Sequence, residues 1–270
     1  MLNFPSMHYV DVHTHLTHDR FRDDLDQVVA RASAAGVAAM VVNGLEPESN
    51  RQILELAETY EEVKPALGIY PVNAVWDRLP ADLPFEVPGF DVDGEIAFIR
   101  EQARAGRLAA VGECGLDGHW VGEGTFPRQE EVFEAFIEIA MESDLPLIIH
   151  TRRLEQRSVE ILRHYRPVKV DFHCFGGKTR LAREVAEKDG WHFSIPANAR
   201  THTAFTRMLR TLPADRILTE TDAPYLGPVR GERNEPANVV GTVECLAELR
   251  GWTLEQARDQ VWRNYMDLFD

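Results

Sequence analysis

Two histidines separated by one residue, His13 and His15, follow a short β-type run near the start of this 270-residue chain. Side chains two positions apart on a strand point to the same face, so both imidazoles can reach one metal ion. Imidazole suits divalent zinc, manganese, iron and cobalt. The pair therefore predicts a metal site. The alternative is a chance pair of surface histidines, since the chain has ten.

Further ligand-type residues end later β-rich runs. Glu113, His150 and His173 each close one run, Glu220 closes the last, and Asp222 follows two positions later. In α/β barrels the chemistry lies at the carboxyl ends of the strands. We therefore expect these side chains to meet the histidine pair on one face of the fold.

β-rich runs alternate along the chain with amphipathic helical windows, and these elements must position the ligand-type residues. The alternation predicts a single α/β domain, residues 1–270, folded as a distorted TIM-type (β/α)8 barrel. The rival doubly wound sheet lacks a Gly-x-Gly-x-x-Gly motif after the first strand. The predicted strands are 8–12, 37–43, 63–69, 109–113, 145–150, 168–173, 191–195 and 216–220. The predicted helices include 23–35, 48–61, 95–105, 128–143, 154–165 and 180–188, with 236–249 and 254–268 after the last strand.

One ion would be crowded by so many ligands, whereas two ions about 3.5–4 Å apart, sharing a carboxylate, would use them all. Glu113 is the natural bridge. The first ion is assigned His13, His15 and Asp222, and the second His150 and His173. A water bound to such a pair is acidified, so hydrolysis is expected, and Asp222 could accept its proton. Alternatively, Asp222 caps a helix that begins at Ala223.

At these residues the sequence resembles the TatD family of metal-dependent deoxyribonucleases, which belongs to the amidohydrolase superfamily of distorted TIM barrels. The resemblance runs from about Tyr9 to the carboxyl end. It implies metal-dependent hydrolysis of DNA phosphodiesters, often from the 3′ end of single strands. The mixture of histidines and carboxylates itself suits two ions of Zn, Mn, Fe or Co, and Mg less well because Mg favours oxygen ligands. The implied ligands are His13, His15, Glu113, His150, His173 and Asp222. The matching segments are 11–16 (DVHTHL), 111–117 (VGECGLD), 147–152 (LIIHTR), 173–177 (HCFGG), 220–226 (ETDAPYL) and 230–239 (RGERNEPANV).

Two segments depart from the family pattern. The family usually has Gly-x-His-Pro after the third strand, whereas residues 68–71 read GIYP, so Tyr70 replaces the histidine. The Tyr70 hydroxyl could donate a hydrogen bond, or the ring could only pack. The loop 117–120 (DGHW) also differs and leaves His119 and Trp120 as candidates for base stacking or phosphate contact.

A phosphodiester needs cationic partners beyond the metals, and Arg152 is the residue that we expect to contact phosphate. The alternative for each cation is a solvated surface charge or an ion pair. Arg233 could instead hold Glu220 or Glu235. The other candidates at or after strand ends are Arg153, Lys178, Arg200 and Arg230.

The formal net charge is −15, which argues against tight nonspecific binding of duplex DNA. It does not exclude hydrolysis, since bound metals can reverse the sign of the charge inside a cleft. Three widely spaced cysteines suggest a reducing cytoplasm rather than a disulfide framework. Residues 1–10 lack the basic start of a signal peptide, and no apolar run approaches the roughly 20 residues of a membrane span, so no membrane partner is expected.

Two other functions stay open. The acidic charge and Tyr70 keep a two-metal ester or amide hydrolase in view, such as a D-aminoacyl-tRNA deacylase or a small-molecule amidohydrolase. A non-catalytic barrel within a larger system is the third hypothesis. The complete set of ligand-type residues argues against it. The favoured partner is DNA, at single-stranded ends, and the sequence does not specify an oligomeric state.

Overall fold

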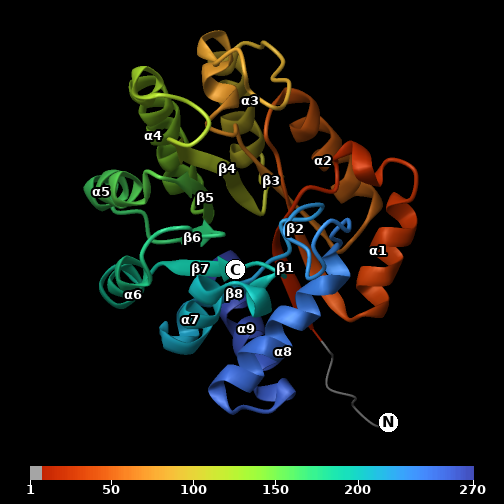
Figure 1. The fold of residues 1–270 in the computed structure, drawn as a ribbon. Coiled ribbons are helices and arrows are strands. Elements are labelled where there is room, and N and C mark those ends of the chain that lie inside the picture. Colours follow the sequence, from red (N-terminus) through yellow and green to blue (C-terminus); the bar gives the residue numbers. More distant parts are fainter. Residues whose placement is uncertain (1–7) are drawn as a thin grey trace.

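The computed structural model describes residues 8–270. Eight parallel strands pair in chain order, from β1 to β8, and helices surround them (Figure 1). This confirms the predicted distorted TIM-type barrel. The predicted domain starts at residue 1, and the segment without the basic start of a signal peptide is 1–10. Residues 1–7 of both lie outside the described residues. The strands are β1 Tyr9–Thr14, β2 Val37–Asn43, β3 Val63–Leu67, β4 Ala110–Asp117, β5 Leu147–Arg152, β6 Val170–His173, β7 His192–Ile195 and β8 Ile217–Thr219.

The helices lie between and after the strands, close to the predicted ranges. No helix among residues 8–270 combines the length and apolar character that crossing a bilayer requires. They are α1 Leu25–Ala34, α2 Pro47–Thr59, α3 Val92–Arg104, α4 Phe126–Ser143, α5 Glu155–Tyr165, α6 Thr179–Lys188, α7 Thr203–Thr211, α8 Val239–Arg250 and α9 Leu254–Phe269.

Five strands end at a residue other than the predicted one: β3 and β8 end earlier, at Leu67 and Thr219, and three others extend further. β4 continues to Asp117, four residues beyond the predicted end at Glu113, because its second half pairs with β5. Similarly, β1 extends to Thr14 and β5 to Arg152. Polar residues and a glycine, Gly115, interrupt the local β pattern in these extensions, although the ladder to the neighbouring strand satisfies their backbone groups. Glu113 and His150 therefore lie inside strands rather than at their last residues.

Local signals explain where several helices begin. α2 starts with Pro47 after a capping box formed by Glu46 and Ser49. α9 starts with a second capping box, formed by Thr253 and Gln256. These side chains satisfy backbone N–H groups that have no partner within the helix. The two helices pack against the strands, α2 against β3 and α9 against β1 and β8.

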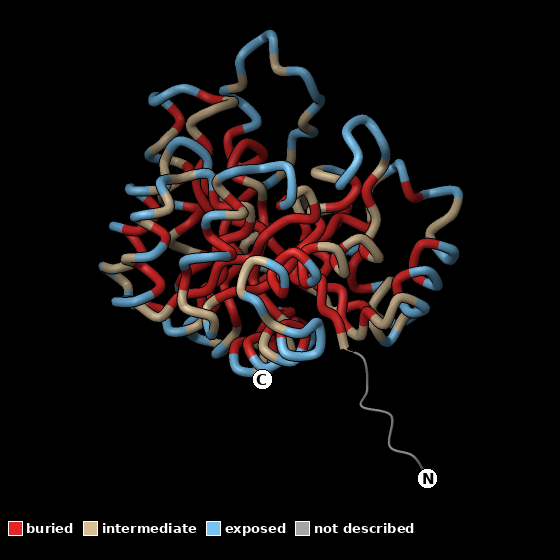
Figure 2. The backbone as a smooth tube through the Cα atoms, turned by 60° about the horizontal axis from the view of Figure 1, so that its bottom comes forward, coloured by how far each residue is buried: buried red, intermediate tan, exposed pale blue. Residues whose placement is uncertain are grey.

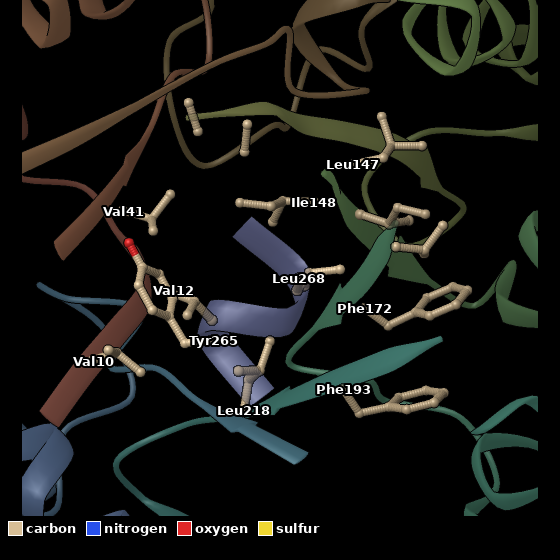
Figure 3. Close-up of a cluster of buried hydrophobic side chains, with 14 of the residues drawn as sticks. Val10, Val12, Val41, Leu147, Ile148, Phe172, Phe193, Leu218, Tyr265 and Leu268 are labelled. Carbon is tan, nitrogen blue, oxygen red and sulfur yellow. The ribbon is translucent and has the colours of Figure 1, made fainter. Parts of the chain in front are cut away.

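The apolar core lies on and around the strands, whereas exposed residues follow the outer helices and loops (Figure 2). Strand β5 is apolar on both faces, since Leu147, Ile148 and Ile149 are all fully buried. That is expected of a parallel strand covered on both sides. In Figure 3 Tyr265 and Leu268 of α9 lie beside strand residues of this core. The packing makes the strands a rigid frame for the polar residues at their ends.

The barrel closes between β1 and β8 through a few bonds rather than a long ladder. An isolated bridge joins Thr14 to Ala223. The backbone N–H of Asp222 donates to the carbonyl of His13 over 2.9 Å, and that of His15 donates to Ala223 over 2.8 Å. These bonds place the first and last predicted ligand segments side by side, although 209 positions separate His13 from Asp222.

Candidate metal centre

Glu113 lies between two groups of imidazoles, and each of its carboxylate oxygens faces one group. Oε2 lies 3.4 Å from Nε2 of His13 and 3.6 Å from Nε2 of His15. Oε1 lies 2.9 Å from Nδ1 of His150 and 3.2 Å from Nε2 of His173. Glu113 as a whole is only 2% exposed. This arrangement places Glu113 where one carboxylate could bridge two ions.

Asp222 completes the group on the β1 side. Its Oδ1 lies 3.4 Å from Nε2 of His15 and 3.7 Å from Nε2 of His13. Asp222 has φ +54°, in the left-handed region that aspartate tolerates better than most residues. No α-helix begins among the residues that follow until α8, at Val239, so the helix-cap interpretation of Asp222 is wrong. The turn instead directs the carboxylate toward the two histidines.

Hydrogen bonds on the far sides of the imidazoles set which nitrogen faces the site. Nδ1 of His15 lies 3.0 Å from the carbonyl of Asn43, which leaves Nε2 as the inward acceptor. Nε2 of His150 lies 3.0 Å from Asp117 Oδ2, so this ring turns Nδ1 inward. Nδ1 of His173 faces Oε1 of Glu220 at the longer distance of 3.8 Å. A metal ligand needs such an orienting partner to hold its tautomer and angle.

The charges at the centre are strongly coupled. Burial by itself would raise the pKa of Glu113, but the neighbouring His173, His13 and His150 lower it well below the ordinary value. Burial and the proximity of His173 lower the pKa of His13 to about 4. For His150, burial lowers the pKa, but hydrogen bonds to Asp117 and Glu113 outweigh it and raise the pKa to about 9. Thus the carboxylate of Glu113 is ionised, and His13 is a neutral ligand-type imidazole at neutral pH.

The donor set fits divalent metal ions. Nε2 atoms of His13 and His15 lie 3.2 Å apart, so two buried nitrogens converge on the same space. Neutral nitrogens and ionised carboxylates are the forms that bind a cation. Three overlapping groups have ligand atoms within 4.8 Å of one another. They are His13, His15 and Glu113; Glu113, His150 and His173; and His13, His173 and Asp222.

The buried aspartate Asp11 joins β1 to the segment that follows β8. Asp11 accepts hydrogen bonds from the backbone N–H of Thr221 over 2.8 Å and from that of His13 over 3.3 Å. Its side chain is fully buried. Desolvation raises the pKa of Asp11 to about 7, against the effect of the Thr221 bonds. Asp11 thereby positions the backbone that carries His13 and the turn that carries Asp222.

Tyr70 lies at the edge of the site and reaches it through Asp117. Its hydroxyl lies 3.4 Å from Asp117 Oδ2, the oxygen that also faces His150. The Tyr70 ring contacts the His150 ring edge-on, with centroids 4.8 Å apart. Burial raises the pKa of this hydroxyl above its ordinary value, so the group stays protonated and able to donate. Tyr70 therefore does both things that the sequence left open: its hydroxyl can donate to Asp117, and its ring packs against His150.

His119, Trp120 and Arg152 gather on the rim. The His119 and Trp120 rings meet at 4.5 Å between centroids. The guanidinium carbon of Arg152 lies 5.4 Å from the Trp120 ring centroid, in the range of a cation–π contact. Phe85, from the long loop before α3, also contacts Trp120, with ring centroids 5.4 Å apart. Asp117 holds this loop by accepting the backbone N–H groups of His119 and Trp120, each over 2.7 Å.

Of the other predicted cations, Arg200 and Arg233 form ion pairs, whereas Arg153, Lys178 and Arg230 are exposed and have no carboxylate oxygen within 4.0 Å of their charged groups among residues 8–270. Arg200 binds Glu248 over 2.5 Å, which is a structural ion pair. Arg233 binds Asp24 over 2.6 Å, so its expected pairing with Glu220 or Glu235 is wrong. Glu235 instead binds Arg31 over 2.7 Å.

Sequence reasoning missed the residues that orient the ligands. Asp117 was recognised only as part of a motif, and Asn43 and Asp11 were not singled out. The alternation of strand β1 could have indicated Asp11, because it shares a face with His13. Asn43 acts through its backbone carbonyl, so no side-chain pattern could have revealed it.

The fold and the convergence of histidines and carboxylates at the strand ends are those of a metal-dependent barrel hydrolase. The model of the family described as TatD related DNase matches residues 10–270, and the chain belongs to this family.

Individual relatives agree along nearly the whole chain. Metal-dependent hydrolase YabD of Bacillus subtilis is 33% identical over 264 residues, covering 96% of this chain and 98% of that protein. The 3′-5′ ssDNA/RNA exonuclease TatD of Pantoea ananatis is 29% identical over 272 residues, covering 96% and 98%. The crystal structure of the TatD homologue YjjV from Escherichia coli has a TM-score of 0.83 at 24% identity and covers 97% of both chains, which shows the shared fold.

Metal affinity should rise with pH through the neutral range. The pKa of His150 in the metal-free protein is about 9, so below that pH a metal must displace a proton from this ring. We expect affinity to increase up to about tenfold per pH unit and to level off above about pH 9. Competition with a chromophoric chelator at several pH values measures this. An affinity independent of pH in that range would contradict the expectation.

Asp117→Asn should weaken metal binding by about 10- to 100-fold, because His150 loses its carboxylate partner. The asparagine oxygen can still accept the N–H groups of His119 and Trp120, so the loop should hold. Tyr70→Phe is the matched control, because it removes only the 3.4 Å contact to the same carboxylate. Calorimetric metal titration should show the large loss for Asp117→Asn alone. Equal affinities in the two variants would exclude this role of Asp117.

Proposed function

We propose that this protein is a two-metal phosphodiesterase that removes nucleotides from DNA, at single-stranded ends. The observation that carries the proposal is Glu113, whose two oxygens each face a separate group of imidazoles. One ion would be held by His13, His15 and Asp222, and the other by His150 and His173, with Glu113 shared. The similarity to the ssDNA/RNA exonuclease of Pantoea ananatis supports a single-stranded nucleic acid as the substrate.

Divalent ions at this centre would acidify water and stabilise the negative charge that develops on the phosphate. The chain supplies a proton acceptor in Asp222. Burial raises the pKa of Asp222, but the hydrogen bond to His15 and the proximity of His13 lower it by more, so the net pKa is below its ordinary value and the carboxylate is ionised. It stands at the open side of the centre, with 15% of its side chain exposed. Glu113, almost completely buried, serves as the fixed anionic bridge.

The rim supports binding of a nucleotide next to the centre. Trp120 and His119 offer aromatic faces on which a base can stack, and stacking contributes about 1–3 kcal/mol per base. Arg152 is exposed, and no carboxylate oxygen lies within 4.0 Å of it among residues 8–270, so it is available to a phosphate. Tyr70 borders the same space through Asp117.

The three cysteines are free, which supports the expected cytoplasmic location.

The test is to incubate the metal-loaded protein with end-labelled single-stranded DNA and, separately, with aminoacyl-tRNA. Release of nucleotides from DNA without deacylation is the expected result. Deacylation without release of nucleotides would replace the proposal by the ester-hydrolase alternative. Inactivity on both, with metal bound, would favour the non-catalytic barrel. Parallel reactions with zinc, manganese, magnesium, iron and cobalt would identify the ion that supports turnover.

A further inference from the structure

Acidic residues line one cavity that opens onto the candidate metal centre. This cavity, of about 730 Å³, runs from His15 toward α1 and α2. Arg22 is its one lysine or arginine lining residue. A phosphate backbone passing through it would meet like charges, which cost binding energy. Its carboxylates are Asp19, Glu46, Glu48, Glu55 and Glu86.

Basic residues line a groove on a different side of the barrel. This α6–α7 groove, of about 550 Å³, is lined by Lys178, Arg180, Arg183 and Arg207, together with Gly177, Thr179, Ala204 and Thr211. No carboxylate is among these lining residues. Such a concentration of cations stands out in a chain whose net charge is −15.

Most cations of the α6–α7 groove are not neutralised by neighbours. Arg183 binds Glu187 over 2.7 Å. Lys178, Arg180 and Arg207 are exposed, and none has a carboxylate oxygen within 4.0 Å among residues 8–270. By contrast, Arg163 on the neighbouring α5 binds Asp189 over 2.8 Å. The three unpaired charges remain available to an anionic partner.

The α6–α7 groove begins at the same end of the barrel as the metal centre. Lys178 follows the ligand-type residue His173 by five positions, so their Cα atoms lie at most about 18 Å apart. Figure 1 shows α6 and α7 adjacent, across the barrel from α1 and α2. Arg180 and Arg183 lie one turn apart on α6, and Ala204, Arg207 and Thr211 follow one face of α7. The groove therefore leads from the rim down the outside of the barrel.

We propose that the α6–α7 groove binds the backbone phosphates of the nucleic-acid strand whose end is cleaved at the metal centre. This inference rests on the proposed function and adds the path of the strand. The strand leaves the centre on the side of β6 and follows the cations, away from the acidic cavity beside α2. Phosphate contacts of this kind supply affinity without reading sequence.

The test compares Arg180→Gln/Arg207→Gln with the control Lys188→Gln/Arg210→Gln. The control changes the same two helices and the same net charge, but its residues do not line the groove. Binding of a fluorescent, phosphorothioate-linked single strand of about 12 nucleotides to the metal-loaded protein is followed by anisotropy over a range of salt concentrations. The groove variant should lose at least tenfold in affinity at low salt. Its slope of log K against log salt should fall by about 1.4, since each lost phosphate contact contributes about 0.7.

Hydrolysis measurements separate this inference from the proposed function. The groove variant should cleave bis(p-nitrophenyl) phosphate, which is too small to reach the groove, as fast as the wild type. If the wild type degrades DNA but both double variants bind the oligonucleotide equally, the groove proposal alone is wrong. Groove-dependent binding without hydrolysis by the wild type would refute the nuclease function and leave the binding path standing. No measurable binding by the wild type would overturn the groove proposal.

Discussion

Glu113→Gln should reduce metal-dependent hydrolysis by on the order of 10³-fold or more. The two oxygens of Glu113 face His13 and His15 on one side and His150 and His173 on the other. An amide keeps the size of the side chain, but it replaces one anionic oxygen with an NH₂ group that repels a cation. One of the two positions should therefore lose its ligand, and elemental analysis should show a lower metal content with a matching loss of kcat.

The control for this substitution is Glu95→Gln. Glu95 is also almost completely buried, at 3% exposure, but it is bonded to Asn50 and Arg51, and neither of these partners belongs to the candidate metal centre. Its replacement should lower stability without changing metal content. Circular dichroism checks that both variants are folded. Full metal occupancy and wild-type turnover in Glu113→Gln would refute the bridging role.

Asp222→Asn should lower kcat by about 10²- to 10³-fold while a metal remains bound. The asparagine oxygen can still approach His15 and His13, and Glu113 and the four histidines are unchanged. The amide, however, cannot accept a proton from the attacking water. We therefore expect the loss in kcat rather than in KM for a small diester, measured by steady-state kinetics on protein of known metal content.

Asp215→Asn is the matched control for this second substitution. Asp215 lies in the short 3-10 helix before β8 and is exposed, so its loss should leave kcat unchanged. Should Asp222→Asn keep its activity with metal bound, Asp222 is not the proton acceptor. Should it lose the metal as well, its main contribution is that of a ligand, and the proton acceptor lies elsewhere.

Much of the architecture followed from local patterns. The alternation of apolar runs such as Leu147, Ile148 and Ile149 with amphipathic windows predicted eight strands in chain order. Those patterns reflect the periods of strands and helices, which depend on backbone geometry and on nearby residues alone. Strand ends were less predictable, because β4 continues to Asp117 only where β5 pairs with it.

The orientation of the ligands could not follow from residue types. His15 turns Nε2 inward because a carbonyl from another strand accepts its Nδ1–H, and His150 turns Nδ1 inward because Asp117 holds Nε2. Likewise, nothing near Arg233 in the sequence indicated that it would bind Asp24, 209 positions earlier. Such pairings depend on distances that exist only when the barrel closes.

The order of residue types was enough to predict that a parallel barrel would bring histidines and carboxylates to one end, since parallel strands share the direction of their carboxyl ends. The position of Glu113 between two imidazole groups and that of Asp222 beside His15 depend on how the closed barrel packs. The same packing also decides where the charge of the chain is concentrated. Net charge is a sum over the whole sequence, whereas binding of an anion depends on which cations remain unpaired in one place. In this barrel they gather along α6 and α7, in a molecule that is acidic overall.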